Sequence, residues 1–160
     1  MMYPGRRLPY GMQLGSGSYD LQPCLNYLHQ NQKLTYSAQL AGTIRTGNNP
    51  LGYRLGNELT LNAWGAWQWL STFSSTIRLE ANSAGKITGK DPTLDPNLEP
   101  SANPANYGGK RLFAFIGTSF QPKHGFLRSS RFSIEYGLPL YQDLNGTQMK
   151  TNNNLYAAYS

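Results

Sequence analysis

Apolar and polar residues alternate along several segments of this chain, and that pattern decides the fold class. In residues 33–45 the even positions are apolar or small, while the odd positions are mostly polar. The even set is Leu34, Tyr36, Ala38, Leu40, Gly42 and Ile44, and the odd set is Lys33, Thr35, Ser37, Gln39, Ala41, Thr43 and Arg45. Segments 19–29 and 73–82 repeat the pattern, except that Ser75 falls on the apolar side. Because sustained helical periodicity is absent and strand side chains alternate between faces, the sequence predicts an all-β fold.

Further strands are predicted at 53–69, 110–120, 126–138 and 152–160, with a weaker candidate near 10–14. In 53–69 one face carries Tyr53, Leu55, Asn57, Leu59, Leu61, Ala63, Trp67 and Trp69. Both faces of 112–116 are apolar, as in a strand that is buried on both sides. A chain of 160 residues suits one domain better than two. We therefore expect residues 1–160 to form a single antiparallel meander of about seven or eight strands.

Strand length and loop length both indicate a membrane protein. Most predicted strands have the length of about 9 to 11 residues that crosses a bilayer, whereas soluble strands average about 5 or 6. The short connections are 30–32, 70–72 and 121–125, and the long ones are 47–52, 83–109 and 140–151. Outer-membrane barrels alternate short periplasmic turns with long external loops in this way. We expect a transmembrane β-barrel or part of one, with 83–109 as a long external loop and a bulge at Pro23, which cannot donate a ladder hydrogen bond.

The overall composition excludes several classes of protein. Charged residues make up only 14% of the chain, against roughly 25% in ordinary soluble domains. The net charge is +6, but the basic residues are scattered, so nucleic acid is not an expected partner. A single cysteine, Cys24, excludes an intramolecular disulfide framework and a multi-cysteine zinc site.

The polar face of the strands holds the candidate functional residues. If the apolar face meets lipid, charged side chains must face the lumen, because Arg or Lys in hydrocarbon costs about 2 to 4 kcal/mol at mid-depth. The lumen-facing candidates are Asp20, Lys33, Arg54, Glu58, Arg78, Glu80, Arg131 and Glu135. The candidates for interfacial aromatic girdles are Tyr19, Tyr27, Tyr36, Tyr53, Trp67, Trp69, Tyr136, Tyr156 and Tyr159. Alternatively, the charges form ion pairs that only stabilise the wall, and the aromatics are there because they suit β-sheets.

No motif indicates catalysis or a cofactor. The chain has no Gly-x-Ser-x-Gly elbow, and Gly-Ser-Gly-Ser at 15–18 lacks the lysine and the following helix of a phosphate loop. His29 and His124 have no second metal ligand nearby in the sequence, and the acidic stretch 91–99 lacks the ligand spacing of a calcium loop. We expect a protein that is not an enzyme and has no cofactor and no metal site.

Three segments resemble outer-membrane proteins of the phenol-degradation meta-pathway family, which are regarded as transporters. Residues 8–23 (LPYGMQLGSGSYDLQP) resemble one segment of that family, and 53–57 (YRLGN) and 136–146 (YGLPLYQDLNG) resemble its closing strands. The resemblance covers nearly the whole chain from Leu8 onward. It implies the C-terminal part of a larger barrel, an expected proline at position 23, and a phenolic or hydrophobic solute. Such barrels usually end on an aromatic residue, whereas this sequence ends on Ser160.

The leading expectation is a channel or uptake protein of the bacterial outer membrane for small solutes, aromatic or hydrophobic ones by resemblance. Its partners would be the lipid bilayer and the solute. One rival is a soluble β-sandwich or calyx that binds a small ligand or glycan through Trp64, Trp67 and Trp69. A second rival is a surface-exposed structural or adhesion protein that makes its contacts through 83–109.

Overall fold

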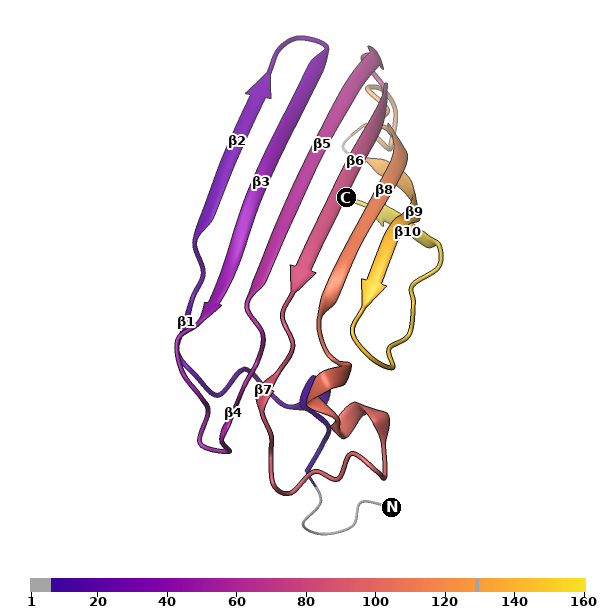
Figure 1. The fold of residues 1–160 in the computed structure, drawn as a ribbon. Helices are drawn as coiled ribbons and strands as arrows, with labels where there is room; N and C mark the ends of the chain where they lie inside the picture. Colours follow the sequence, from indigo (N-terminus) through magenta and orange to yellow (C-terminus); the bar gives the residue numbers. More distant parts are fainter. Residues whose placement is uncertain (1–6, 129) are drawn as a thin grey trace.

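An eight-stranded antiparallel sheet dominates the computed structural model, which describes residues 7–128 and 130–160 (Figure 1). Its strands are β1 (Asp20–Leu21), β2 (Cys24–Gln30), β3 (Leu34–Arg45), β5 (Glu58–Leu70), β6 (Phe73–Ala84), β8 (Gly109–Phe120), β9 (Phe132–Leu144) and β10 (Asn154–Tyr159). β1 and β2 pair with successive parts of β3, and from β3 onward each strand pairs with the next strand of the sheet. The predicted all-β fold and antiparallel meander are confirmed.

The connections lie at two opposite ends of the sheet. At the end that we call the short-turn end, residues 31–33, 71–72 and 121–131 join consecutive strands. At the opposite end, the long-loop end, the connections are 46–57, 85–108 and 145–153. The predicted turn 121–125 is longer than expected, so the two ends differ less sharply than the sequence predicts.

A small two-stranded sheet and three short 3-10 helices lie at the long-loop end. The sheet pairs β4 (Tyr53–Arg54) with β7 (Thr88–Gly89), and the helices are η1 (Tyr10–Met12), η2 (Pro100–Ala102) and η3 (Pro104–Asn106). Tyr10, Tyr53 and Ile87 form a buried cluster there, against which Leu51, Leu55, Leu94 and Tyr107 pack. The weak strand candidate at 10–14 therefore forms no strand, because its first three residues form η1. The segment predicted as an external loop has its own packed interior.

The predicted strand 53–69 is split in two. Residues 55–57 leave the sheet, and a Cβ on Gly56 would lie 2.1 Å from the carbonyl oxygen of Gly85. This close approach of two backbones is open only to glycine. Asn57 fixes the start of β5, because its carbonyl accepts the Gly85 amide at 2.9 Å and its side chain accepts the Arg45 amide at 2.9 Å.

The predicted strand 126–138 is displaced toward the C-terminus, since β9 begins at Phe132 and continues to Leu144. Before it the backbone turns: the Arg128 amide donates to the Gly125 carbonyl at 3.3 Å, and the Ser130 amide donates to the Leu127 carbonyl at 2.9 Å. Gly125 has a φ of 82°, a conformation that favours glycine. These local bonds replace the ladder bonds that a strand would need.

Pro23 lies in the two-residue gap between β1 and β2, at an edge of the sheet. Its carbonyl accepts the Gly42 amide at 2.9 Å, so its backbone is hydrogen-bonded to β3, the strand beside it. The predicted bulge is instead an interruption of an edge strand, a position in which the missing N–H of proline is tolerated. Among the described residues, β2 and β10 form the two edges and do not pair with each other.

No helix of the described residues is long and apolar enough to cross a membrane.

Candidate functional site: the polar face of the sheet

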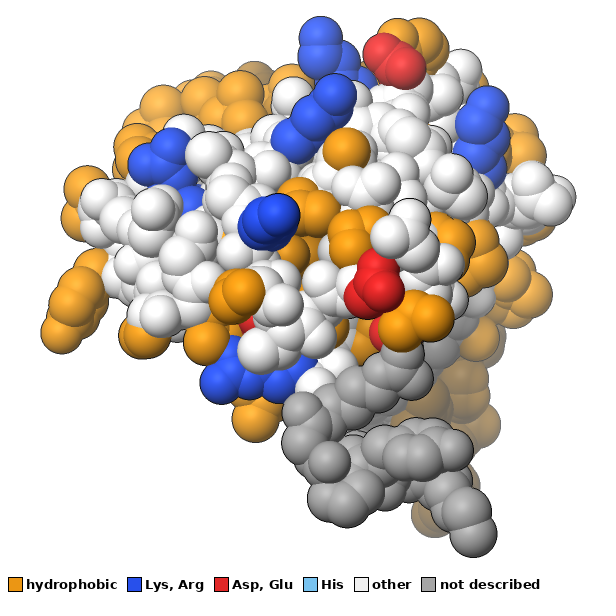
Figure 2. Space-filling view, turned by 60° about the horizontal axis from the view of Figure 1, so that its bottom comes forward, with side chains coloured by type: hydrophobic (Ala, Val, Ile, Leu, Met, Phe, Trp, Pro, Cys, Tyr) orange, Lys and Arg blue, Asp and Glu red, His pale blue; other side chains and the backbone are white. Residues whose placement is uncertain are grey.

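The two faces of the sheet differ in chemistry as the alternation predicts. One face, the apolar face, presents aliphatic side chains from every long strand, and they remain exposed to between 41% (Leu40) and 72% (Leu25). Its other aliphatic members include Ile44, Leu59, Leu61, Ile77, Leu79, Ile116, Ile134, Leu138, Leu140 and Leu155. Figure 2, which looks at the molecule from its long-loop end, shows hydrophobic side chains along the outer margin of the view. No layer formed by the described residues covers this face.

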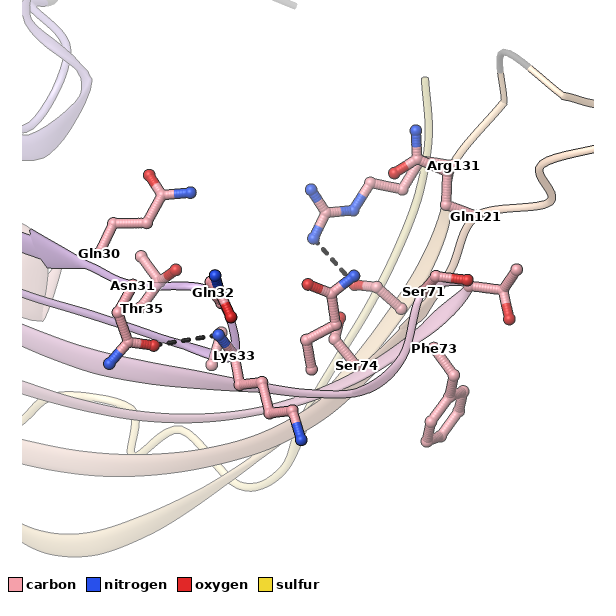
Figure 3. Close-up of a pocket in the computed structure, with 14 residues that line it drawn as sticks. Gln30, Asn31, Gln32, Lys33, Thr35, Ser71, Phe73, Ser74, Gln121 and Arg131 are labelled. Atoms are coloured by element: carbon pink, nitrogen blue, oxygen red, sulfur yellow. Dashed lines mark hydrogen bonds between the residues drawn. The ribbon is translucent and has the colours of Figure 1, made fainter.

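The opposite face, the polar face, is the sheltered one. Phe113 and Phe115 of β8 point to it and are buried, as is Ser119. In Figure 3 the sheet curves around a pocket on this face, and Phe73, which belongs to the apolar face, extends on the other side of the ribbon. Residues 112–116 are apolar on both sides because Phe113 and Phe115 form an aromatic patch on the polar face.

An ion-pair network occupies the middle of the polar face. Arg78 of β6 donates two hydrogen bonds to Glu135 of β9, at 3.1 and 2.6 Å, and one to Glu80 at 2.7 Å. Its guanidinium carbon lies 3.7 Å from the ring centroid of Phe115, a distance at which a cation–π interaction forms. Two charged side chains from non-adjacent strands are thus joined across β8.

Two glycines make room for this network. A Cβ on Gly117 of β8 would lie 2.6 Å from the Thr76 hydroxyl oxygen, and one on Gly137 of β9 would lie 2.3 Å from the Phe115 ring. Both positions are on the polar face next to the charged residues, since Gly117 pairs with Glu135 and Gly137 pairs with Phe115. Without side chains at these positions, Arg78 and Phe115 lie directly against β9.

A second ion-pair group lies at the long-loop end of the same face. Arg45 forms a short hydrogen bond to Asp20 and another of 3.3 Å to Glu58. Asp20 also accepts the hydroxyl groups of Ser16 at 2.7 Å and Ser18 at 3.0 Å. The Gly-Ser-Gly-Ser segment at 15–18 therefore anchors this carboxylate.

A cavity of about 640 Å³ lies on the polar face between the two ion-pair groups and the long loops. Its wall combines carboxylates, amides and aromatic rings, and loop residues close one side. The residues are Glu58, Thr60, Glu80, Asn82, Arg111, Phe113, Phe115 and Tyr156 from the sheet, with Tyr107, Gln148 and Thr151 from the loops. Such a wall suits a small solute with both polar and apolar parts.

The predicted lumen-facing residues separate into four groups. Arg78, Glu80 and Glu135 come together in the central network, and Asp20 and Glu58 meet through Arg45, which the prediction omitted. Lys33 and Arg131 line a separate pocket of about 340 Å³ at the short-turn end. Arg54 lies in β4, outside the eight-stranded sheet. Its predicted place on the wall is wrong, because the first part of the segment 53–69 leaves the sheet.

Most of the predicted girdle aromatics lie on the apolar face. Tyr27 lies near Tyr36, Trp67 near Trp69, and Tyr159 near Phe132, with ring centroids between 5.2 and 6.1 Å apart, all toward the short-turn end. Tyr19 is almost fully exposed beside β1 at the long-loop end, and Tyr136 lies in the middle of its strand, opposite Ile116.

Two predicted aromatics lie elsewhere. Tyr53 is 2% exposed inside the loop cluster, because its segment leaves the sheet. Tyr156 points to the polar face, since it pairs with Glu135 and its ring lies 6.1 Å from Phe115. Alternation alone predicts both rings in a girdle. This prediction fails where a segment leaves the sheet, and alternation does not separate a polar-face tyrosine from a girdle tyrosine.

A buried carboxylate in the long loop was not predicted as a functional or structural residue. Asp91 is 1% exposed and accepts the amide and hydroxyl of Thr93 at 2.9 and 2.7 Å, while Arg7 lies 3.6 Å from its other oxygen. Burial raises the pKa of Asp91, but the two Thr93 hydrogen bonds and Arg7 together outweigh burial and leave that pKa below its usual value. Burial also raises the pKa of the neighbouring Tyr10 and Tyr53.

Among the described residues, no group of three or more His, Cys, Asp or Glu side chains is arranged to hold a metal ion. His29 stacks near Tyr36 at 5.0 Å between ring centroids.

Comparisons with protein-family models, with curated proteins and with solved structures found no match for this chain.

Proposed function

We propose that this chain forms part of the wall of a β-barrel channel or uptake protein in the bacterial outer membrane. The apolar face would contact lipid, and the polar face would line a water-filled lumen through which small solutes pass. One observation carries the proposal: a broad aliphatic face stays exposed on every long strand, while ion pairs occupy the sheltered face. A soluble protein hides such a face in its interior.

The large size of the apolar face favours contact with lipid. Burying one Leu or Ile side chain is worth about 1.5 to 3 kcal/mol, so a dozen half-exposed aliphatics represent a large unused driving force in water. In a bilayer those side chains are in their preferred surroundings, and all backbone groups of an antiparallel sheet except those at its edges are satisfied internally. The reverse orientation would put Arg78 and Arg45 in hydrocarbon, at a cost of about 2 to 4 kcal/mol each at mid-depth.

The positions of aromatic rings and loops support the same proposal. Aromatic side chains of the apolar face gather toward the short-turn end, as in an interfacial girdle. The longest connection, 85–108, lies at the opposite end, where outer-membrane barrels have their external loops. The short-turn end would then face the periplasm.

The solute class rests on the cavity and on the resemblance. A wall of carboxylates, amides and the rings of Phe113, Phe115 and Tyr156 suits small amphiphilic molecules. The resemblance to the phenol-degradation meta-pathway family makes phenolic solutes the first to test. We propose no catalytic step.

Tryptophan quenching tests which face meets lipid. Trp67 lies on the apolar face and Trp64 on the polar face of the same strand, where it pairs with Arg78. Two single-tryptophan variants are needed: W64F/W69F, which keeps Trp67, and W67F/W69F, which keeps Trp64. In vesicles of brominated lipid, we expect strong quenching of Trp67 and little quenching of Trp64.

The two-variant design also separates the rival functions. A calyx or sandwich that is stable in plain buffer would show no lipid quenching of either tryptophan, and this result would overturn the proposal. For the adhesion alternative, the measurement is solute flux through the reconstituted protein. Flux of phenol-sized solutes that depends on the protein supports a channel over a structural role.

A further inference from the structure

The acidic residues of the chain are unevenly distributed between the two ends of the sheet. The acidic residues are Asp20, Glu58, Glu80, Asp91, Asp95, Glu99, Glu135 and Asp143, so residues 24–44, 59–79 and 100–134 contain no carboxylate. These three stretches include all three connections of the short-turn end. Lys33, Lys123, Arg128 and Arg131 lie there. This end of the sheet therefore carries four basic side chains and no Asp or Glu side chain, and Ser160 pairs there with Arg131 through two backbone hydrogen bonds.

Two of these cations line the pocket of about 340 Å³ on the polar face. Arg131 lies beside the start of β9 and its guanidinium extends over the pocket, whereas Lys33 lies in the turn before β3 and its side chain extends away from Arg131 (Figure 3). Arg131 donates to the Ser119 hydroxyl at 3.4 Å, and Ser119 is 7% exposed. Thr35, Gln68 and Ser74 add hydroxyl and amide groups, and no carboxylate lines the pocket.

We propose that this pocket binds the carboxylate group of small organic anions at the short-turn mouth of the lumen. The planar guanidinium of Arg131 matches a two-oxygen acceptor, and the neighbouring hydroxyl and amide groups complete its coordination. Rings of Arg and Lys give anion preference in pores. The inference rests on the proposed function and deepens it by naming a class of solute.

The first experiment measures ion selectivity of the full chain in a planar lipid bilayer. In gradients of potassium acetate and of potassium chloride, the reversal potential gives the permeability of each anion relative to potassium. We expect acetate to be preferred over potassium, and the preference to fall about two- to fivefold in K33Q or R131Q, because each removes one charge at close range. Folding of each variant is checked by heat-modifiable gel mobility.

Two further variants make the test specific. K150Q removes an exposed charge from the long-loop end and is the matched control, for which we expect unchanged selectivity. In the wild type we expect acetate to be more permeant than chloride. R131K keeps the charge but loses the forked geometry, so its preference for chloride over potassium should persist while the advantage of acetate over chloride is lost. If R131K behaves as the wild type in both salts, the pocket supplies charge alone and the carboxylate assignment is overturned.

A binding measurement keeps the pocket and the channel distinguishable. Carbon-13-labelled acetate is titrated into the detergent-folded chain, and we expect line broadening that is lost in R131Q. Conductance without anion preference and without acetate binding overturns the inference but leaves the channel intact. Acetate binding without conductance supports the pocket and shows that this chain alone does not form an open pore.

Discussion

Arg78 shows how a single residue combines several interactions on the polar face. It donates hydrogen bonds to carboxylates on two strands, and its guanidinium lies over the ring of Phe115. Its positive charge is therefore balanced by side chains of the same face. The alternation of the sequence places Arg78 and Glu135 on the same face, but it does not show that they meet. That contact depends on the register of β6, β8 and β9, which is fixed by long-range pairing.

Asp91 gives a residue-scale prediction about pH. Its pKa is depressed in the folded state, so the unfolded chain binds more protons in acid, and its contribution to stability is present above the unfolded value of about 3.9. This contribution is lost as pH falls through the folded pKa. Below that pKa we expect faster hydrogen exchange in residues 85–108, measured by mass spectrometry and corrected for the intrinsic pH dependence of exchange.

The matched variants are D91N and D95N. Asp95 makes a similar local bond, accepting the Asn97 amide at 2.9 Å, but it lies at the surface. At neutral pH we expect D91N to destabilise the loop by about 1 to 2 kcal/mol, because hydrogen bonds to a buried charge are lost, and to remove the acid sensitivity. D95N should keep the wild-type stability of the loop and its acid sensitivity. Equal behaviour of the two variants would contradict a structural role for the buried carboxylate.

At the scale of elements, β8 depends on the absence of a side chain at Gly117. In G117A the new Cβ would lie 2.6 Å from the Thr76 hydroxyl and 2.9 Å from the Ile134 carbonyl, so strands β6 and β9 would have to shift. We expect a loss of about 1 to 3 kcal/mol in unfolding free energy, measured by urea titration in detergent. G47A is the control, since no atom lies within 4 Å of its Cβ position. A neutral G117A would show that the sheet adapts there.

The sequence predicts the clearest strands well and the irregular ones poorly. Residues 33–45 and 110–120 match β3 and β8 closely, because alternation over a long segment follows the geometry of a strand. The segment 53–69 looks equally regular, but the close approach of Gly56 to Gly85 and the cluster around Tyr53 remove its first part from the sheet. Such contacts join segments far apart in the sequence, and no local pattern encodes them.

At the scale of the whole molecule, the two faces should respond oppositely to the same substitution. Leu79 points to the apolar face and is 46% exposed, whereas Asn62 points to the polar face and pairs with Glu80. In a bilayer we expect L79R to cost about 2 to 4 kcal/mol and N62R to be close to neutral. The measurement is reversible urea unfolding from vesicles. A small effect of L79R would contradict lipid contact, because a half-exposed leucine in water tolerates arginine.

The candidate site was partly predictable. The polar identity of one face follows from alternation, and so does the membership of Arg78, Glu80 and Glu135. The aromatic patch of Phe113 and Phe115 was visible in the sequence only as a strand that is apolar on both sides. The loop residues of the cavity, Tyr107 and Gln148, could not be assigned, because nothing in a loop sequence specifies where the loop folds back onto the sheet.

The two edge strands have a topological consequence. From β2 through β3, β5, β6, β8 and β9 to β10 every neighbouring pair is antiparallel, so the first and last strands run in the same direction. Joining these two edges to each other would create one parallel seam. If the proposed barrel is an all-antiparallel cylinder, it must have an odd number of additional strands between these two edges.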